Sequence, residues 1–317
     1  MSLPAEPVRL RPVAARPGLG ANAGAATAAV LFGASVVAVR VAVQDIPPLS
    51  LAVLRFGQAA LLLVGALLLA APARLRVQRR SLPLLILLGA VLFTLFPVTF
   101  NAGLRWTEAS RGALMLATMP LWSAWLARGV AGERLAGRQL AGVVVSVLGI
   151  ALAFVEPRAL HGGAHALIGD GLLLVTALLG ALYGVLAKRA LARDAAVTVT
   201  TYAMLFGAVL LAPAALVEGL LPALGRLDGR LLALVVFLGV PGGALAFFLW
   251  TWALSRLTPT QVAVYVNLNP VVAALLGIWL LGERRSLGFA LGFAAVVAGV
   301  GLVNWPRPAA KDPRGSR

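Results

Sequence analysis

Two asparagines lie in the middle of a long apolar stretch of this 317-residue chain. Asn267 and Asn269 stand just before Pro270, within residues 257–282, a segment without Asp, Glu, Lys or Arg. A proline leaves a backbone carbonyl one turn earlier without its hydrogen bond, so a helix here can offer a carbonyl and two amides to a bound molecule. If the stretch crosses a membrane, the amides either serve a function or hydrogen-bond neighbouring helices. The sequence leaves both interpretations open.

A second apolar stretch, residues 231–255, is interrupted near its middle and then becomes aromatic. Pro241-Gly242-Gly243 breaks it, and Trp250 and Trp252 follow. Broken helices and aromatic faces together favour a binding site for an apolar or aromatic molecule. Trp252 is closer to the end of the stretch, where tryptophans commonly anchor a helix at the membrane surface. Trp250 is therefore the better candidate.

Other candidates share a polar or aromatic side chain within an apolar stretch, often beside a proline or glycine. Arg40 could receive a substrate carboxylate, pair with Asp45 or reach lipid phosphates. The residues predicted to bind substrate are Asn267, Asn269, Trp250, Tyr183, Asn101, Trp122, Tyr265, Thr94, Ser35 and Arg40. The predicted hinges are Pro120, Pro270, Pro97, Gly242 and Gly243.

Several classes of chemistry lack the residues that they need. The chain has no cysteine, and His161 and His165 have no apparent third metal ligand. No glycine-rich phosphate-binding loop is present. All 11 acidic residues lie at the ends of apolar stretches, in loops or in tails, not at mid-depth where a proton- or sodium-coupled carrier would hold a carboxylate. We expect no metal, no cofactor and no enzymatic activity, and facilitated movement or exchange rather than carboxylate-coupled pumping.

Ten apolar stretches must position these side chains. Of all residues 61% are hydrophobic and 12% charged, whereas about a quarter are charged in a soluble domain. A membrane-spanning helix needs about 20 mostly apolar residues. The stretches are 22–39, 56–73, 81–104, 112–127, 139–155, 171–187, 195–217, 231–255, 257–282 and 286–306. They place Arg40 at the end of the first helix and Arg55 at the start of the second.

The basic residues indicate an orientation. Most of the 27 Lys and Arg residues fall in the tails and in alternate loops on the same side, which predicts that both termini are cytoplasmic. We expect residues 1–21 and 306–317 to be disordered tails. The basic clusters are short and lie between apolar stretches, so they do not favour nucleic-acid binding.

The chain resembles itself when it is shifted by 150 residues. Pro120 then falls on Pro270, and Gly132-Glu133-Arg134 on Gly282-Glu283-Arg284, while Gly142 and Gly149 meet two further glycines. The halves are residues 22–155 and 169–305. Each holds five helices, an odd number, so the second half is predicted to enter the membrane from the opposite side. Inverted repeats of this kind are typical of secondary transporters.

Several segments carry a family resemblance. "AVLFGASVVAVRVAV", "PPLSLAVLRFGQAALLL", "GDGLLLVTALLGALYGVLAKRAL", "LARGVAGERL" and "NLNPVVAALLGIWLLGERR" resemble EamA-type transporters of the drug/metabolite transporter superfamily. The resemblance covers about residues 22–305 and implies a ten-helix inverted-repeat carrier, usually in a bacterial inner membrane, often exporting amino acids or related metabolites. The chain departs from the family at Phe32, where Trp is common, and at Asn269, where many members have Glu.

The sequence thus predicts an all-α integral membrane protein with ten transmembrane helices in two inverted five-helix repeats. Its predicted function is secondary transport of small organic metabolites (amino acids or related compounds), in the direction of export, across the inner membrane by alternating access. Its partners would be the small-molecule substrate and the lipid bilayer, with the chain a monomer or a homodimer. The alternative is a non-transporting membrane protein of the same fold, such as a lipid flippase component or a scaffold.

Overall fold

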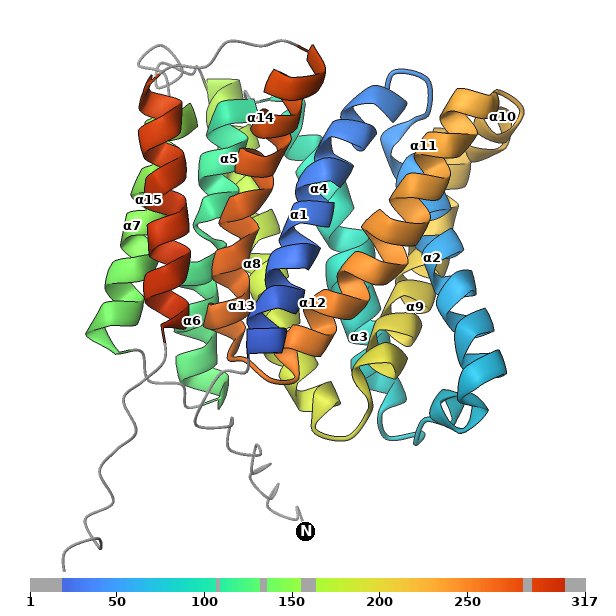
Figure 1. Cartoon of the computed structure of the whole chain (residues 1–317). Helices are drawn as coiled ribbons and strands as arrows, with labels where there is room; N and C mark the ends of the chain where they lie inside the picture. The colour runs from blue at the N-terminus through green and yellow to red at the C-terminus, as the bar shows by residue number, and fades with distance from the viewer. Residues whose placement is uncertain (1–18, 107–108, 132–135, 155–163, 282–286, 306–317) are drawn as a thin grey trace, which may run out of the picture.

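The computed structural model describes residues 19–106, 109–131, 136–154, 164–281 and 287–305. Within these ranges all regular structure is helical, and the long helices run side by side as a bundle (Figure 1). Residues 19–21 of the expected N-terminal tail belong to the first helix. The rest of the expected tails and both Gly-Glu-Arg loops lie outside the described residues. The prediction of an all-α membrane protein is confirmed at this level.

Eight helical segments are long and apolar enough to cross a membrane among the described residues. The first is α1 (Leu19–Ala42) and the second α2 (Pro48–Ala70), both longer than their charge-free stretches. The eight segments are Leu19–Ala42, Pro48–Ala70, Leu82–Leu104, His165–Leu191, Ala196–Glu218, Gly229–Leu254, Pro259–Leu276 and Leu287–Asn304.

The two remaining predicted spans have a different form. Residues 112–127 fall in α5 (Ala109–Ala117) and α6 (Met119–Ala131), which are separated at Thr118. Residues 139–155 correspond to α7 (Gly137–Phe154), a shorter apolar helix. Pro120 is the second residue of α6, and a proline at a helix start needs no backbone donor.

Two of the spans contain a wider helical turn at matching places. Between α3 (Leu82–Gly89) and α4 (Phe96–Leu104) lies the π-helical segment η2 (Ala90–Leu95). Between α11 (Gly229–Gly239) and α12 (Ala246–Leu254) lies the π-helical segment η4 (Val240–Leu245). The two segments begin 150 residues apart. Such π-turns inside helices are frequent at functional sites.

Local signals explain several helix boundaries. Pro48 begins α2, and the carboxylate of Glu218, from the end of α9 (Ala196–Glu218), accepts hydrogen bonds of 2.7 and 2.9 Å from the backbone amides of Leu49 and Ser50. An acidic group is favourable there because the first amides of a helix have no internal partner. Thr258 and Gln261 form a reciprocal capping box at the start of α13 (Pro259–Ala263).

The ninth predicted span consists of α13, a 3-10 turn and a longer helix. This turn, η5 (Val264–Asn267), leads into α14 (Leu268–Leu281), so Pro270 is the third residue of α14. The remaining helices are α8 (Ala164–Leu191), the short α10 (Leu220–Leu224) and α15 (Leu287–Asn304), with the 3-10 turn η1 (Pro72–Leu75) after α2.

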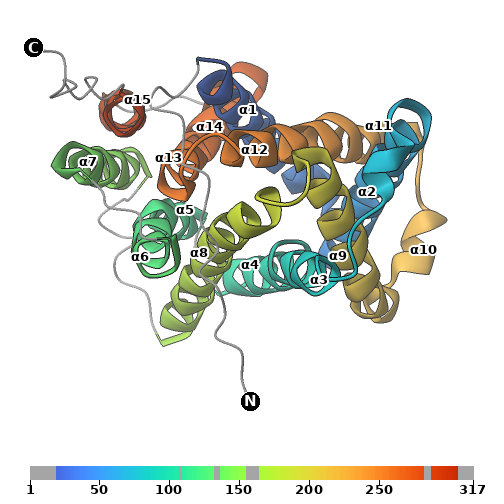
Figure 2. The ribbon, with the colours of Figure 1, turned by 90° about the horizontal axis from the view of Figure 1, so that it is seen from below.

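Helices α7 and α15 form a closely packed pair at one edge of the bundle (Figure 2). Glycines make the contact: a Cβ added to Gly142 would lie 2.8 Å from the carbonyl oxygen of Gly299, and one added to Gly149 would lie 2.8 Å from that of Gly292. Small residues let membrane helices approach backbone to backbone. The glycines that align under the 150-residue shift thus pack against each other across two helices.

Helices α1 and α8 make corresponding contacts on either side of the core. Helix α1 contacts α12 and α14, whereas α8 contacts α4 and α6. Helix α2 packs along α9. These helices surround the largest cluster of buried apolar side chains, to which α1, α2, η2, α8, α9 and α12 all contribute.

Candidate functional site

A connected group of aromatic rings occupies the core where α1, α2, η2 and α12 meet. The ring of Phe247 lies 4.7 Å from that of Phe32, 4.9 Å from that of Phe93 and 5.8 Å from that of Phe56, measured between centroids. All of these contacts are edge-to-face, an arrangement that aromatic quadrupoles favour. We call Phe32, Phe56, Phe93, Phe247, Trp250 and Tyr183 the aromatic cluster.

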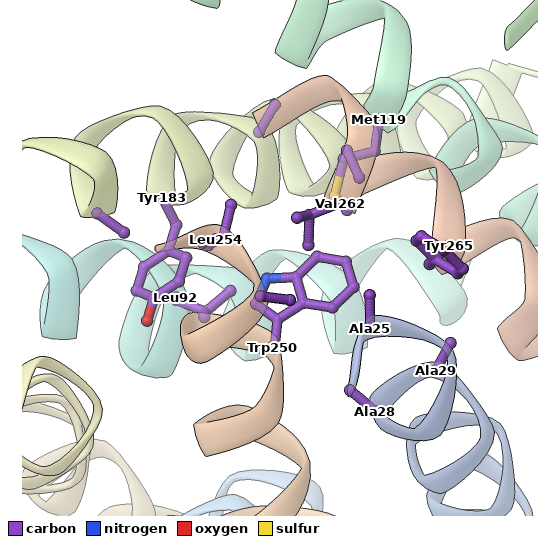
Figure 3. Close-up of a cluster of buried hydrophobic side chains, with 14 of the residues drawn as sticks. Ala25, Ala28, Ala29, Leu92, Met119, Tyr183, Trp250, Leu254, Val262 and Tyr265 are labelled. Carbon is purple, nitrogen blue, oxygen red and sulfur yellow. The ribbon is translucent and has the colours of Figure 1, made fainter. Parts of the chain in front are cut away.

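Trp250 of α12 and Tyr183 of α8 extend the aromatic cluster beyond its four phenylalanines. Trp250 lies 5.8 Å from Phe32, and Tyr183 of α8 lies 6.1 Å from Phe93. Both side chains are buried. Figure 3 shows the Trp250 indole between Ala25 of α1 and Val262 of α13. In the described part of the chain the indole N–H of Trp250 has no hydrogen-bond partner. It is therefore available to donate a hydrogen bond to a bound molecule.

Two phenol groups close to Trp250 have their hydroxyls satisfied. Tyr183 Oη lies 3.2 Å from Thr251 Oγ1, which joins α8 to α12. Tyr265 of η5 donates a hydrogen bond of 3.1 Å to Oδ1 of Asn22 in α1. Figure 3 shows Tyr183 and Tyr265 on opposite sides of Trp250. The structure therefore brings together three of the predicted binding residues, Tyr183, Trp250 and Tyr265.

The predicted hinge glycines lie beside the aromatic cluster, within the π-helical segment η4. A Cβ on Gly242 would collide with Oγ of Ser35, and one on Gly243 would lie 3.0 Å from Cβ of Ala59. Ser35 is buried and donates a 2.7 Å hydrogen bond to the carbonyl of Leu31. Ser35 therefore belongs to the contact between α1 and η4. Pro97 follows the equivalent segment η2, as the second residue of α4.

The two predicted asparagines have different surroundings. Asn267 is buried, and its Nδ2 donates a hydrogen bond of 2.6 Å to Oγ of Ser146 on α7. Its Oδ1 is buried without a partner in the described structure, and so is Oδ1 of Asn269. The Asn267 contact fits the helix-to-helix alternative, whereas the side chain of Asn269 keeps an unused acceptor. The backbone carbonyl of Asn269 packs on Gly33 of α1.

The four other predicted residues have surroundings of their own. Thr94 donates a 3.0 Å hydrogen bond to the carbonyl of Gly207 in α9. Trp122 donates one of 3.1 Å to the hydroxyl of Thr118, within its own helical turn. Asn101 is half-buried on α4, and Arg40 is exposed in the last turn of α1.

Trp252 and His165 have packing contacts elsewhere. Trp252 packs on Gly24 of α1, and the Arg256 guanidinium lies 4.1 Å from its ring centroid, near the end of α12. This place agrees with its interpretation as an interfacial anchor. His165 stacks on Trp106 at 5.1 Å, and His161 lies outside the described residues.

One charged residue in this region was missed by the sequence argument. Because α2 begins at Pro48, Arg55 lies two turns inside the helix and not at its start. Its Nη2 donates a 2.7 Å hydrogen bond to the carbonyl of Gly242, and its Cζ lies 5.3 Å from the Phe56 ring centroid and 5.7 Å from that of Phe247. The signal was present: a Pro-Pro pair at residues 47–48 marks a helix start.

The site has the form of an aromatic core bordered by a cation and a few polar groups. The sequence model of the EamA-like transporter family matches residues 20–155 and again residues 167–305. The chain belongs to the EamA-like transporter family. This membership is confirmed over nearly the whole length that the sequence resemblance covered.

Known proteins similar to this EamA-like transporter include two bacterial relatives. "Probable terminal-alkyne amino-acid exporter" of Streptantibioticus cattleyicolor is 30% identical over 72% of this chain and 75% of its own. "Probable amino-acid metabolite efflux pump" of Escherichia coli is 27% identical over 86% of this chain and 90% of its own. A solved crystal structure superposes with a TM-score of 0.77 at 20% identity, covering 89% of this chain and 95% of the other. It shows that the overall fold is shared.

Proposed function

We propose that this EamA-like transporter exports amino acids or related small metabolites across a bacterial inner membrane by alternating access. The observation that carries the proposal is the aromatic cluster, whose rings come from five of the spans, those that contain α1, α2, η2, α8 and α12. Its rings offer apolar surface, while the Trp250 N–H and the Arg55 guanidinium at its edges can orient a polar group. The names of the two relatives support an amino-acid class of substrate.

The proposed mechanism uses ten membrane segments in two inverted halves, residues 22–155 and 169–305, with both termini cytoplasmic. Two observations support the halves: the π-helical segments begin 150 residues apart, and α1 with its partners α12 and α14 corresponds to α8 with α4 and α6. Inverted halves can exchange conformations and so open the same site to either side.

Hydrogen bonds join the two proposed halves at both ends of the bundle. Tyr265 reaches Asn22 near the start of α1, and Glu218 at the end of α9 accepts from Leu49 and Ser50 at the start of α2. The rings of the aromatic cluster are in contact between these ends. We assign this conformation to a closed intermediate, from which opening to one side would break the bonds at that end only.

Counterflow in proteoliposomes tests the proposal. The purified chain is reconstituted, the vesicles are loaded with an unlabelled amino acid, and entry of the same radiolabelled amino acid is followed for a panel that includes aromatic and aliphatic members. Transient accumulation above protein-free vesicles for at least one amino acid is expected. Folded, reconstituted protein that gives no accumulation for any member contradicts the proposal.

The alternative function is tested on the same vesicles. A lipid flippase component would move a fluorescent phospholipid between leaflets, which dithionite quenching of the outer leaflet detects. We expect quenching to stop near one half of the fluorescence, as in protein-free vesicles. Quenching beyond one half, together with no amino-acid counterflow, would favour the lipid-moving alternative.

A further inference from the structure

We infer that Arg55 binds the carboxylate of the substrate, so that the transported molecules are monocarboxylates with an apolar side chain. The inference rests on the proposed transport function and names the substrate class of the same site. In this role Arg55, which lies inside the helix bundle, takes the place of the exposed Arg40, the residue that the sequence suggested for a substrate carboxylate.

A purely structural role does not fully explain why an arginine lies at this position of α2. A guanidinium has five N–H donors. In the described structure Arg55 uses Nη2 on the carbonyl of Gly242, its Nε is buried without a partner, and it makes no ion pair. A cation inside a membrane span is costly unless it is paired, and such residues commonly mark a substrate pathway. A negative partner is missing from the described structure, and a bound anion would supply it.

The guanidinium is directed into the protein and not along the lipid surface. Its hydrogen bond runs from α2 to η4, and its Cζ lies within 5.3 and 5.7 Å of two rings of the aromatic cluster. Planar guanidinium binds carboxylate through two parallel hydrogen bonds. A carboxylate held there places the rest of a small molecule against Phe56 and Phe247.

A second polar group stands one turn along the same face of α2. Gln58, three residues after Arg55, packs tightly against Gly239, and its Oε1 is buried without a partner. Residues three apart on a helix are neighbours on its surface. An unused acceptor beside an unused donor suits a zwitterion, with the carboxylate on Arg55 and the ammonium group on Gln58. This arrangement selects amino acids among the monocarboxylates.

The test compares acids with their amides in counterflow. The probes are L-phenylalanine and L-leucine, each against its carboxamide, which keeps the side chain and the ammonium group but has no carboxylate. Wild type is expected to prefer the acids. Arg55→Gln is expected to raise KM for the acids by about 10- to 100-fold, the effect of losing a charge-assisted hydrogen bond, and to change KM for the amides much less. Arg55→Lys keeps the charge without the fork and is expected to retain part of the preference.

The controls separate the possible failures. Arg40→Gln, which removes an exposed arginine, is expected to leave the acid preference unchanged. Equal transport of acids and amides by wild type would overturn this inference while the proposed function stands, whereas absence of counterflow across the whole amino-acid panel would contradict the proposed function. An equal loss of acids and amides in Arg55→Gln would show that Arg55 only holds η4, and would also overturn the inference.

Lipid phosphate is the other source of an anion for this guanidinium. The comparison is therefore repeated in vesicles of phosphatidylcholine with and without phosphatidylglycerol. The acid preference is expected to be the same in both. A preference that falls as anionic lipid is added would show that Arg55 binds headgroups, which contradicts the assignment to substrate.

Discussion

Asn267 and Ser146 are joined by a buried hydrogen bond of 2.6 Å that runs from Nδ2 of the amide to Oγ of the serine. It connects η5 to α7, which lies with α15 at the edge of the bundle (Figure 2). One of the two amides that the sequence left open between a pathway role and a contact between helices thus has its donor directed at a neighbouring helix.

The first prediction concerns this bond. Asn267→Ala and Ser146→Ala should each lower the free energy of unfolding by about 1 kcal/mol, the size of an interhelical hydrogen bond in membrane proteins. The double variant should lose little more than either single variant, because both remove the same bond. Unfolding in mixed micelles with increasing SDS measures the change. If Asn267→Ala lost counterflow with unchanged stability while Ser146→Ala kept normal counterflow, Asn267 would act in the transport pathway and not mainly as a contact between helices.

The second prediction concerns the glycine contact between α7 and α15. Gly299→Ala should lower the free energy of unfolding by about 1–3 kcal/mol, because its methyl group would lie 2.5 Å from the carbonyl oxygen of Gly142. Gly301→Ala in the same helix is the matched control, since no atom lies within 4 Å of its added Cβ. The same SDS unfolding measures both variants. Equal stability of the two would mean that the helices are less closely packed than the structure describes.

The third prediction concerns orientation, and the absence of native cysteine makes it simple to test. Leu19 begins α1 with 89% of its side chain exposed, and Gln44 follows the other end of the same helix. If both termini are cytoplasmic, a membrane-impermeant maleimide added to intact cells should label Gln44→Cys and not Leu19→Cys. Lysed cells, in which both should react, provide the control. The reverse pattern would place the N-terminus outside.

The overall helical pattern could be predicted from the sequence because each span is a long apolar run, but the helix ends could not. A search for charge-free stretches must stop at each arginine, so it began the second helix after Arg55, whereas the Pro47-Pro48 pair begins it at Pro48. The carbonyl of Gly242 in η4 satisfies one of the guanidinium's donors inside the bundle. That partner lies 187 residues away in the chain.

The candidate site was predictable only in part, because its contacts join residues that are far apart in the chain. Trp250 and Tyr183 were expected from their types and from nearby glycines, and both belong to the aromatic cluster. Phe56 and Phe93 are ordinary phenylalanines in apolar stretches, and nothing local in the sequence separates them from lipid-facing ones. They become part of the site because α2 and η2 both pack toward α12. Which rings meet depends on helix packing, which periodicity alone does not specify.

The most direct test of the central claim, that substrate passes through the aromatic cluster, compares two adjacent phenylalanines of α12. Phe247 contacts three other phenylalanine rings, whereas Phe248 makes no ring contact in the described part of the chain. Counterflow of the best-transported amino acid is measured for Phe247→Leu and Phe248→Leu, each reconstituted at equal density after its stability has been checked. We expect kcat/KM to fall about tenfold in Phe247→Leu, because aromatic contacts are lost, and to stay within about twofold of wild type in Phe248→Leu. Equal transport by the two variants would contradict the central claim.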